Sequence, residues 1–295
     1  MNFYGWLWGK RLTKPSFCGI IIAVQSGGRE MKFSIDHDLH IHSNISKCSG
    51  DPEQTPERIL RYAHENGLKT VCITDHFWDE AVTVLPESWY KGQGLSHISK
   101  ALPLPQVDGV RFLFGCETEL DRTLAVGVAK DHYDLFDFII IPTTHMHMNG
   151  FTLTKEEGEN AQTRAEAWVK RLDAVLSMDL PFHKVGLAHL TCTLIAPTRE
   201  MHLETLSRIP EEEMHRLFEK AAALGVGIEL NESFNHYTED EWKLILRPYR
   251  IAKSHGCKFY LGSDAHTVKG LEYAMQKHQR MVEDLGLTEE DKFTI

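Results

Sequence analysis

Short and nearly continuous apolar runs alternate with helical segments from Met31 to the end of this 295-residue chain. Runs without a polar–apolar alternation are typical of strands buried on both faces of a parallel sheet. Repeated βα units of this number predict an α/β fold with a closed or nearly closed barrel, and a doubly wound open sheet is the alternative. The seven runs are residues 33–39, 69–74, 110–116, 137–143, 185–188, 226–230 and 258–262.

Helix boundaries between these runs have clear local signals. Thr55 followed by Pro56 predicts an N-cap and first helical position, and Gly67 predicts the end of that helix. Thr238 and Glu241 have the spacing of a capping box. Residues 77–106 contain several Pro and Gly residues and predict a long loop with a short helix over the barrel mouth. The other predicted helices cover residues 210–224, from 238 to near 256, and from 267 onward.

Composition and charge restrict the class of protein. With 42% hydrophobic and 25% charged residues, the chain is typical of soluble globular proteins, and no apolar run is long enough to span a membrane. The net charge of −10 disfavours nucleic acid as a partner without excluding it. The six cysteines form no C-x-x-C pair and predict a reducing compartment, hence a cytoplasmic location. The oligomeric state is not predicted.

The first thirty residues differ from the rest. They show no periodicity, contain a Ser-Gly-Gly sequence at residues 26–28, and resemble a signal peptide only faintly. We predict an N-terminal extension over residues 1–30, either disordered or part of a misassigned start. One enzymatic domain is predicted over residues 31–295.

Ionisable side chains follow almost every predicted strand. Active-site residues of parallel barrels gather at the carboxyl ends of the strands. His40 and His42 are two apart in an extended segment, so both side chains point to one side. A single histidine in such a place is more often structural, but a whole facing set without a cation would be costly in desolvation and repulsion. The pattern therefore predicts a metal centre. The strand-end residues are His40, His42, Asp75, His76, Glu117, His145, His189, Asn231, Asp264 and His266.

The motifs around these residues resemble those of the PHP (polymerase and histidinol phosphatase) family. They are D-L-H-I-H-S at 38–43, I-T-D-H at 73–76, G-C-E at 115–117, T-H at 144–145, A-H at 188–189 and G-S-D-A-H at 262–266. They occur in family order over nearly the whole chain. The resemblance implies a distorted seven-stranded, TIM-like (β/α)7 barrel over residues 31–295. It also implies two or three divalent metal ions, which could be Zn, Mn or Fe.

The resemblance also implies the metal ligands, position by position. The first metal would be held by His40, His42, Glu117 and Asp264, and Glu117 would bridge to a second metal held by His145 and His189. His76 and His266 would hold a third metal, together with a group from the loop after His42. In that loop Cys48 stands where the family often has His or Asp, so Cys48 or Asp51 completes the site, or the third metal is lost. Asp38, Asp75, Glu229 and Asn231 are expected to support the ligands through hydrogen bonds.

The expected reaction is hydrolysis of a small phosphomonoester, histidinol phosphate-like or a nucleotide, by a metal-bound hydroxide. Asp264 and His266 are the candidates for catalytic proton transfer. The predicted partner is this small phosphorylated substrate. Substrate-binding residues are not identified, although Arg122, Arg164 and Arg199 are possible phosphate ligands. The alternatives are an exonuclease-type phosphodiesterase acting on nucleotide ends, a non-catalytic metal-binding PHP domain, and an amidohydrolase, which Glu117 at a mid-barrel strand end disfavours.

Overall fold

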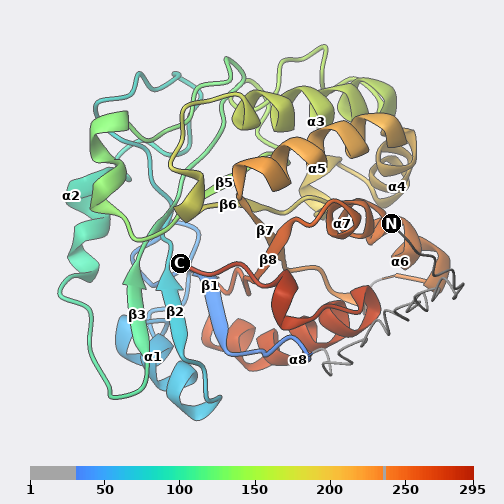
Figure 1. Cartoon of the computed structure of the whole chain (residues 1–295). Helices are drawn as coiled ribbons and strands as arrows, with labels where there is room; N and C mark the ends of the chain where they lie inside the picture. The colour runs from blue at the N-terminus through green and yellow to red at the C-terminus, as the bar shows by residue number, and fades with distance from the viewer. Residues whose placement is uncertain (1–30, 235–236) are drawn as a thin grey trace, which may run out of the picture. The chain divides into compact units, whose positions relative to one another are not determined.

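The computed structural model describes residues 31–234 and 237–295, which form an α/β domain (Figure 1). The predicted extension at residues 1–30 lies outside the described residues. Every strand pair in the described part is parallel, in one sheet of order β1-β2-β3 and one of order β4-β5-β6-β7-β8. The strands are β1 (His37–Ile41), β2 (Thr70–Ile73), β3 (Arg111–Phe114), β4 (Cys116–Glu117), β5 (Ile139–Pro142), β6 (Val185–Ala188), β7 (Gly227–Leu230) and β8 (Lys258–Leu261).

The division into two sheets arises at Gly115, inside the run predicted as one strand over 110–116. The Gly115 N–H donates to the Ile73 carbonyl at 2.9 Å, but the next N–H, of Cys116, donates to the Phe138 carbonyl at 3.1 Å. The chain thus changes its partner from β2 to the segment that leads into β5. A side chain at Gly115 would place its Cβ 2.5 Å from the Phe138 carbonyl oxygen, so only glycine fits this crossing point.

Side chains from both sheets pack into a common interior. One buried cluster contains Leu39 and Cys72 from the first sheet and Ile140, Ala188 and Tyr260 from the second. The ends of the two sheets also meet, because the Asp264 N–H donates to the His40 carbonyl at 2.7 Å and the His42 N–H donates to the Ala265 carbonyl at 3.1 Å. The α/β class and the parallel strands are confirmed, whereas a closed seven-stranded barrel stays a prediction.

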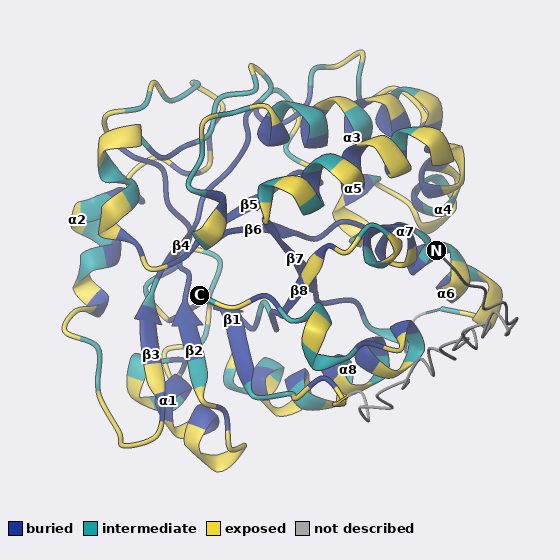
Figure 2. Cartoon of the chain, viewed as in Figure 1, coloured by how far each residue is buried: buried dark blue, intermediate teal, exposed yellow. Residues whose placement is uncertain are grey.

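The helices cover the outside of the sheets and bury one face each (Figure 2). The helix starts predicted at Thr55, Thr238 and Thr267 are confirmed, since each side chain caps the first turn. The helix expected to run from 238 to near 256 is broken at Leu246, because Pro248 follows and has no N–H to continue it. The helices are α1 (Pro56–Glu65), α2 (Leu95–Ile98), α3 (Ala161–Leu176), α4 (Arg199–Arg208), α5 (Glu211–Leu224), α6 (Glu239–Ile245), α7 (Arg247–Ser254) and α8 (Val268–Leu285).

Other differences from the sequence-based expectation are small. Strand β1 begins at His37 rather than at residue 33, because the Ser34 N–H is bound by the Glu289 carboxylate instead of a neighbouring strand. Helices α3 and α4 were not predicted. The long loop over 77–106 does contain a short helix, α2, as expected. None of the helices in the described ranges has the length and apolar character needed to cross a membrane.

Candidate metal centre

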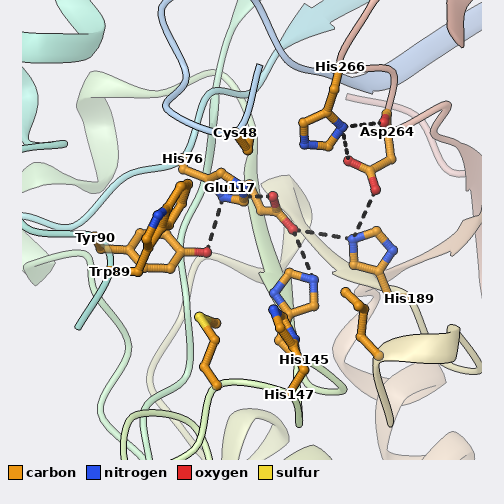
Figure 3. A pocket seen from close by; sticks show the side chains of 12 residues that line it. Cys48, His76, Trp89, Tyr90, Glu117, His145, His147, His189, Asp264 and His266 are labelled. Atoms are coloured by element: carbon orange, nitrogen blue, oxygen red, sulfur yellow. Dashed lines mark hydrogen bonds and ion pairs between the residues drawn. The ribbon is translucent and has the colours of Figure 1, made fainter. Parts of the chain in front are cut away.

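The carboxyl ends of the strands bring the predicted ligands into one cluster. Figure 3 shows the members that line the cavity, without His40 and His42. His40 lies in β1 and His42 directly follows it, Glu117 ends β4, and His189 directly follows β6. The other members lie on the turns that leave the strands. All of the predicted ligands except His40 and His42 line a cavity of about 440 Å³. The fold therefore places side chains from distant parts of the sequence around a single space.

A first group consists of His40, His42, Glu117 and Asp264. The Nε2 atoms of His40 and His42 are 3.1 Å apart. Glu117 Oε2 lies 3.5 and 3.2 Å from these two nitrogens, and Asp264 Oδ1 lies 3.4 and 3.1 Å from them. Ligands of a tetrahedral zinc ion with bonds of about 2.0–2.1 Å are separated by about 3.3 Å. The spacing of the four atoms fits one shared cation.

Two carboxylate oxygens of this group indicate that a cation fits here. Glu117 Oε2 and Asp264 Oδ1 are buried and have no hydrogen-bond donor in the described structure. Buried polar atoms are almost always hydrogen-bonded, and an unsatisfied charged oxygen costs more than a neutral one. A cation between these oxygens and the two imidazoles would satisfy both. The residues therefore fit a bound divalent metal.

A second group shares Glu117 and adds His145 and His189. Glu117 Oε1 lies 3.3 Å from His189 Nε2 and 3.9 Å from His145 Nε2. The two oxygens of Glu117 thus face different groups. A carboxylate in this position can bridge two metal ions, as the family resemblance implied.

A third group consists of His42, Cys48, His76 and His266. The Cys48 Sγ lies 4.0 Å from His42 Nδ1, and the rings of His42 and His266 stack at a centroid distance of 4.2 Å. The carboxylate of Asp51 lies elsewhere, because it accepts a hydrogen bond from the Val268 N–H at the start of α8. Of the two residues that could complete this site, the structure brings only Cys48 into it.

Opposite charges in the metal-free cluster shift several pKa values. Burial raises the pKa of Glu117, but the imidazoles of His76 and His40 outweigh it and hold the pKa well below its usual range. Burial likewise opposes ionisation of Cys48, yet hydrogen bonds from His266 and His42 lower the pKa of its thiol to about 3. The carboxylates of Glu117 and Asp264 and the Cys48 thiol are thus already deprotonated. The pKa values of His40, His42, His76 and His189 are raised instead, so these imidazoles must lose protons before they bind a metal.

Two of the candidate ligands have strained backbones. His189 has φ 60° and Asp264 has φ 53°, the left-handed region that non-glycine residues rarely adopt. The third non-glycine residue of this kind in the described ranges, Leu124, lies outside the cluster. Strained residues that persist at strand ends are typical of functional sites.

The residues expected to support the ligands divide into two pairs. Glu229 Oε1 lies 2.5 Å from His40 Nδ1, and its Oε2 lies 3.5 Å from His189 Nδ1. The Asn231 amide also lies 2.7 Å from His189 Nδ1. Contacts to Nδ1 leave the opposite nitrogens, Nε2, free to face the Glu117 carboxylate.

The other pair does not touch an imidazole. Asp38 accepts hydrogen bonds from the Ser263 N–H at 2.9 Å and the Tyr62 hydroxyl at 3.2 Å. Asp75 accepts two from Ser43, each at 2.7 Å. These carboxylates fix the turns that follow the strands, because backbone and hydroxyl donors are nearer to them than any ring nitrogen.

Glu119 is a supporting residue that was not predicted. It is fully buried, and its Oε2 lies 2.8 Å from His145 Nδ1. Its Oε1 lies 3.6 Å from Arg171 of α3, a buried guanidinium that also donates to three backbone carbonyls. The sequence contained a signal for this role. Glu119 stands two residues after Glu117, and the same spacing in an extended segment placed the side chains of His40 and His42 on one side.

We expect Glu119→Gln to weaken the second group without unfolding the domain. The amide keeps the shape but loses the charge that orients the His145 ring, and such substitutions cost about 10- to 100-fold in metal affinity or activity. Metal titration of the purified variant checks this. Glu166→Gln, on the exposed face of α3, is the matched control. Unchanged metal affinity in Glu119→Gln would remove the supporting role.

Other singled-out residues lie outside the ligand groups. His147 lines the cavity next to His145, with ring centroids 5.5 Å apart. His132 pairs with Asp79 at 2.6 Å, away from the cluster. The arginines considered as phosphate ligands do not line the cavity. Arg122 and Arg164 donate to backbone carbonyls, and Arg199 pairs with Glu241.

Comparisons with known proteins give one family match and two similar solved structures. The PHP domain family model matches residues 38–233, more than half of the chain. The histidinol phosphate phosphatase of Lactococcus lactis, solved with Zn, L-histidinol and phosphate, is 17% identical with a TM-score of 0.53, over 88% of this chain and 99% of its own. A putative histidinol phosphatase of Listeria monocytogenes is 14% identical with a TM-score of 0.58, over 81% and 99%. No curated protein sequence matches the chain.

The chain belongs to the PHP family. Within this family it is a metal-dependent phosphoesterase, and its clustered His, Glu and Asp side chains are suited to divalent metal ions. At these low identities, the likeness to the two solved phosphatases concerns the fold alone.

Proposed function

We propose that residues 31–295 form one catalytic domain that hydrolyses a small phosphomonoester. The observation that carries this proposal is that the three ligand groups described above share members, and that each places side chains on one cavity of about 440 Å³. A space of this size admits a small ester but not a duplex. None of the residues lining it is Lys or Arg, which argues against a polyanionic substrate.

Divalent cations bound in these groups would lower the pKa of a coordinated water and offset the charge of the phosphoryl oxygens. The protein side chains position the candidate metal ligands for this chemistry. Glu117 faces two groups with its two oxygens, and Glu229 and Glu119 orient three of the imidazoles from behind. Asp264 and His266 are our candidates for proton transfer. Both line the cavity, and the His266 side chain remains 30% exposed.

We also propose that the chain holds three metal ions, with Cys48 as a ligand of the third. A thiolate beside imidazoles favours Zn or Fe over Mn, because softer donors select softer metals. The three imidazoles grouped with Cys48 come from the residue after β1, the turn after β2 and the turn after β8, and the sulfur is the fourth ligand atom of the group.

We expect Cys48→Ser to lower the metal content from about three to about two ions per chain. Its Co²⁺ form should also lack the sulfur-to-metal absorption band that the parent protein shows, because a hydroxyl replaces the thiolate. Elemental mass spectrometry and absorption spectroscopy check these results. Cys192→Ser is the matched control, since Cys192 lies in none of the ligand groups. An unchanged Co²⁺ spectrum in Cys48→Ser would exclude Cys48 as a ligand.

The substrate is tested by phosphate release from purified protein prepared without chelator. The ligands of the Lactococcus enzyme make histidinol phosphate the first ester to assay, followed by a nucleoside monophosphate and an aryl phosphodiester. Release from monoesters with the metal present supports the proposal. Preferential cleavage of the diester would favour the phosphodiesterase alternative. A protein that binds metal but releases phosphate from none of these esters would favour the non-catalytic metal-binding domain.

A further inference from the structure

Three large apolar side chains line the cavity, namely Trp89, Met148 and Leu194, and we call them the apolar wall. Trp89 is 41% exposed and Leu194 is 37% exposed, although both line the cavity together with Met148. Large apolar side chains exposed beside a buried polar centre are suited to an apolar part of a ligand. The candidate metal ligands line the same space, and Trp89 lies beside one of them, His76 (Figure 3).

The position of Trp89 is fixed by the metal centre itself. Its ring stands edge-on to His76, at a centroid distance of 5.2 Å and an angle of 89°. The next residue, Tyr90, is buried, and its hydroxyl lies 3.1 Å from His76 Nδ1 and 3.4 Å from Glu119 Oε2. The loop is therefore anchored beside the ligands, and the Trp89 ring is held in place before a substrate arrives.

The space beside this wall offers no counter-charge to a leaving group. Among the residues that the structure describes, the only carboxylates lining the cavity are Glu117 and Asp264, and both belong to the ligand groups. A charged leaving group would lose hydration here without gaining a partner.

Building on the proposed phosphatase function, we infer that the wall of Trp89, Met148 and Leu194 selects esters whose leaving group is an uncharged planar ring. Such a ring can pack against the exposed indole and remove apolar surface from water, while the phosphoryl group faces the metal ligands. Trp89 is the specificity-determining residue. Aryl phosphates are preferred over glycerol phosphate, which has no ring, and over histidinol phosphate, whose leaving group carries an ammonium.

The test compares steady-state kinetics of the metal-loaded full chain with phenyl phosphate, histidinol phosphate and glycerol 2-phosphate. Inorganic phosphate serves as a competitive inhibitor that reports on the metal centre alone. We expect Trp89→Ala to raise KM for phenyl phosphate about tenfold, the size of one lost ring contact, with little change in kcat. KM for glycerol 2-phosphate and Ki for inorganic phosphate should not change, and Trp89→Phe should retain most of the preference.

Tyr273→Ala is the control for removing an exposed aromatic ring, because Tyr273 is 56% exposed on α8 and does not line this cavity. Equal kcat/KM for the three esters in the parent protein would overturn the inference and leave the phosphatase function intact. An equal loss in Trp89→Ala for all esters and for inorganic phosphate would also overturn it, since the loop would then only support His76. No hydrolysis of any monoester would instead count against the proposed function.

Discussion

Replacing Glu117 by Gln should abolish turnover and remove metal from two groups at once. Glu117 Oε2 lies 3.0–3.5 Å from nitrogens of His40, His42 and His76, and Oε1 faces His189 at 3.3 Å. An amide has the same shape but no charge, so it cannot bridge two cations. Metal ions supply several kcal/mol of transition-state stabilisation. At about 1.4 kcal/mol for each factor of ten, we expect kcat/KM to fall by about 10³-fold or more.

Phosphate release and elemental analysis on the same preparation check this prediction. Glu87→Gln is the control, because its carboxylate is 47% exposed and outside the ligand groups. If Glu117→Gln kept the parent metal content, the bridging role would be wrong even if activity fell. If it kept the parent activity, the cluster would not be the active site.

The proximity of the candidate ligands could be predicted because their positions in the sequence, directly after predicted strands, determine where they lie in a parallel sheet. Every parallel strand ends at the same edge, so His40, Glu117 and His189 were expected to meet without knowledge of the distances between them. The helix starts at Thr55 and Thr238 were equally accessible, since a cap is a contact within one turn.

What could not be predicted depends on contacts between distant segments. The division into two sheets at Gly115 requires the Phe138 carbonyl, and no pattern within residues 110–116 contains it. The choice between Cys48 and Asp51 was open because both lie on the same loop. It depends on the α8 N-terminus, which binds the Asp51 carboxylate. Trp89 lies in the loop over 77–106, which has no periodicity, and Met148 and Leu194 come from two other segments, so their meeting at one cavity followed only from the structure.

Removing the metals should lower the thermal stability of the domain strongly, by about 10 °C or more. A ligand that binds only the folded state at about 1,000 times its Kd stabilises that state by about 4 kcal/mol. One kcal/mol corresponds to about 2–4 °C in Tm for domains of 150–250 residues. Thermal unfolding with chelator, and again after Zn²⁺ is restored, measures the effect. A variant with both His40→Ala and His42→Ala is the control, because its Tm should respond much less to chelator.

The difference in Tm between metal-loaded and metal-free protein should increase as the pH rises. In the metal-free protein, burial lowers the pKa of His40, but Glu229 and Glu117 outweigh it and raise the pKa to about 10. The stability from protonated His40 is therefore complete below the unfolded pKa of about 6.5, and it declines as pH rises toward 10. Metal binding has the opposite dependence, because protons compete for the imidazoles. The Tm difference between loaded and stripped protein should be larger at pH 8.5 than at pH 6.5. A difference that does not vary with pH would mean that the stabilising ions bind outside the histidine cluster.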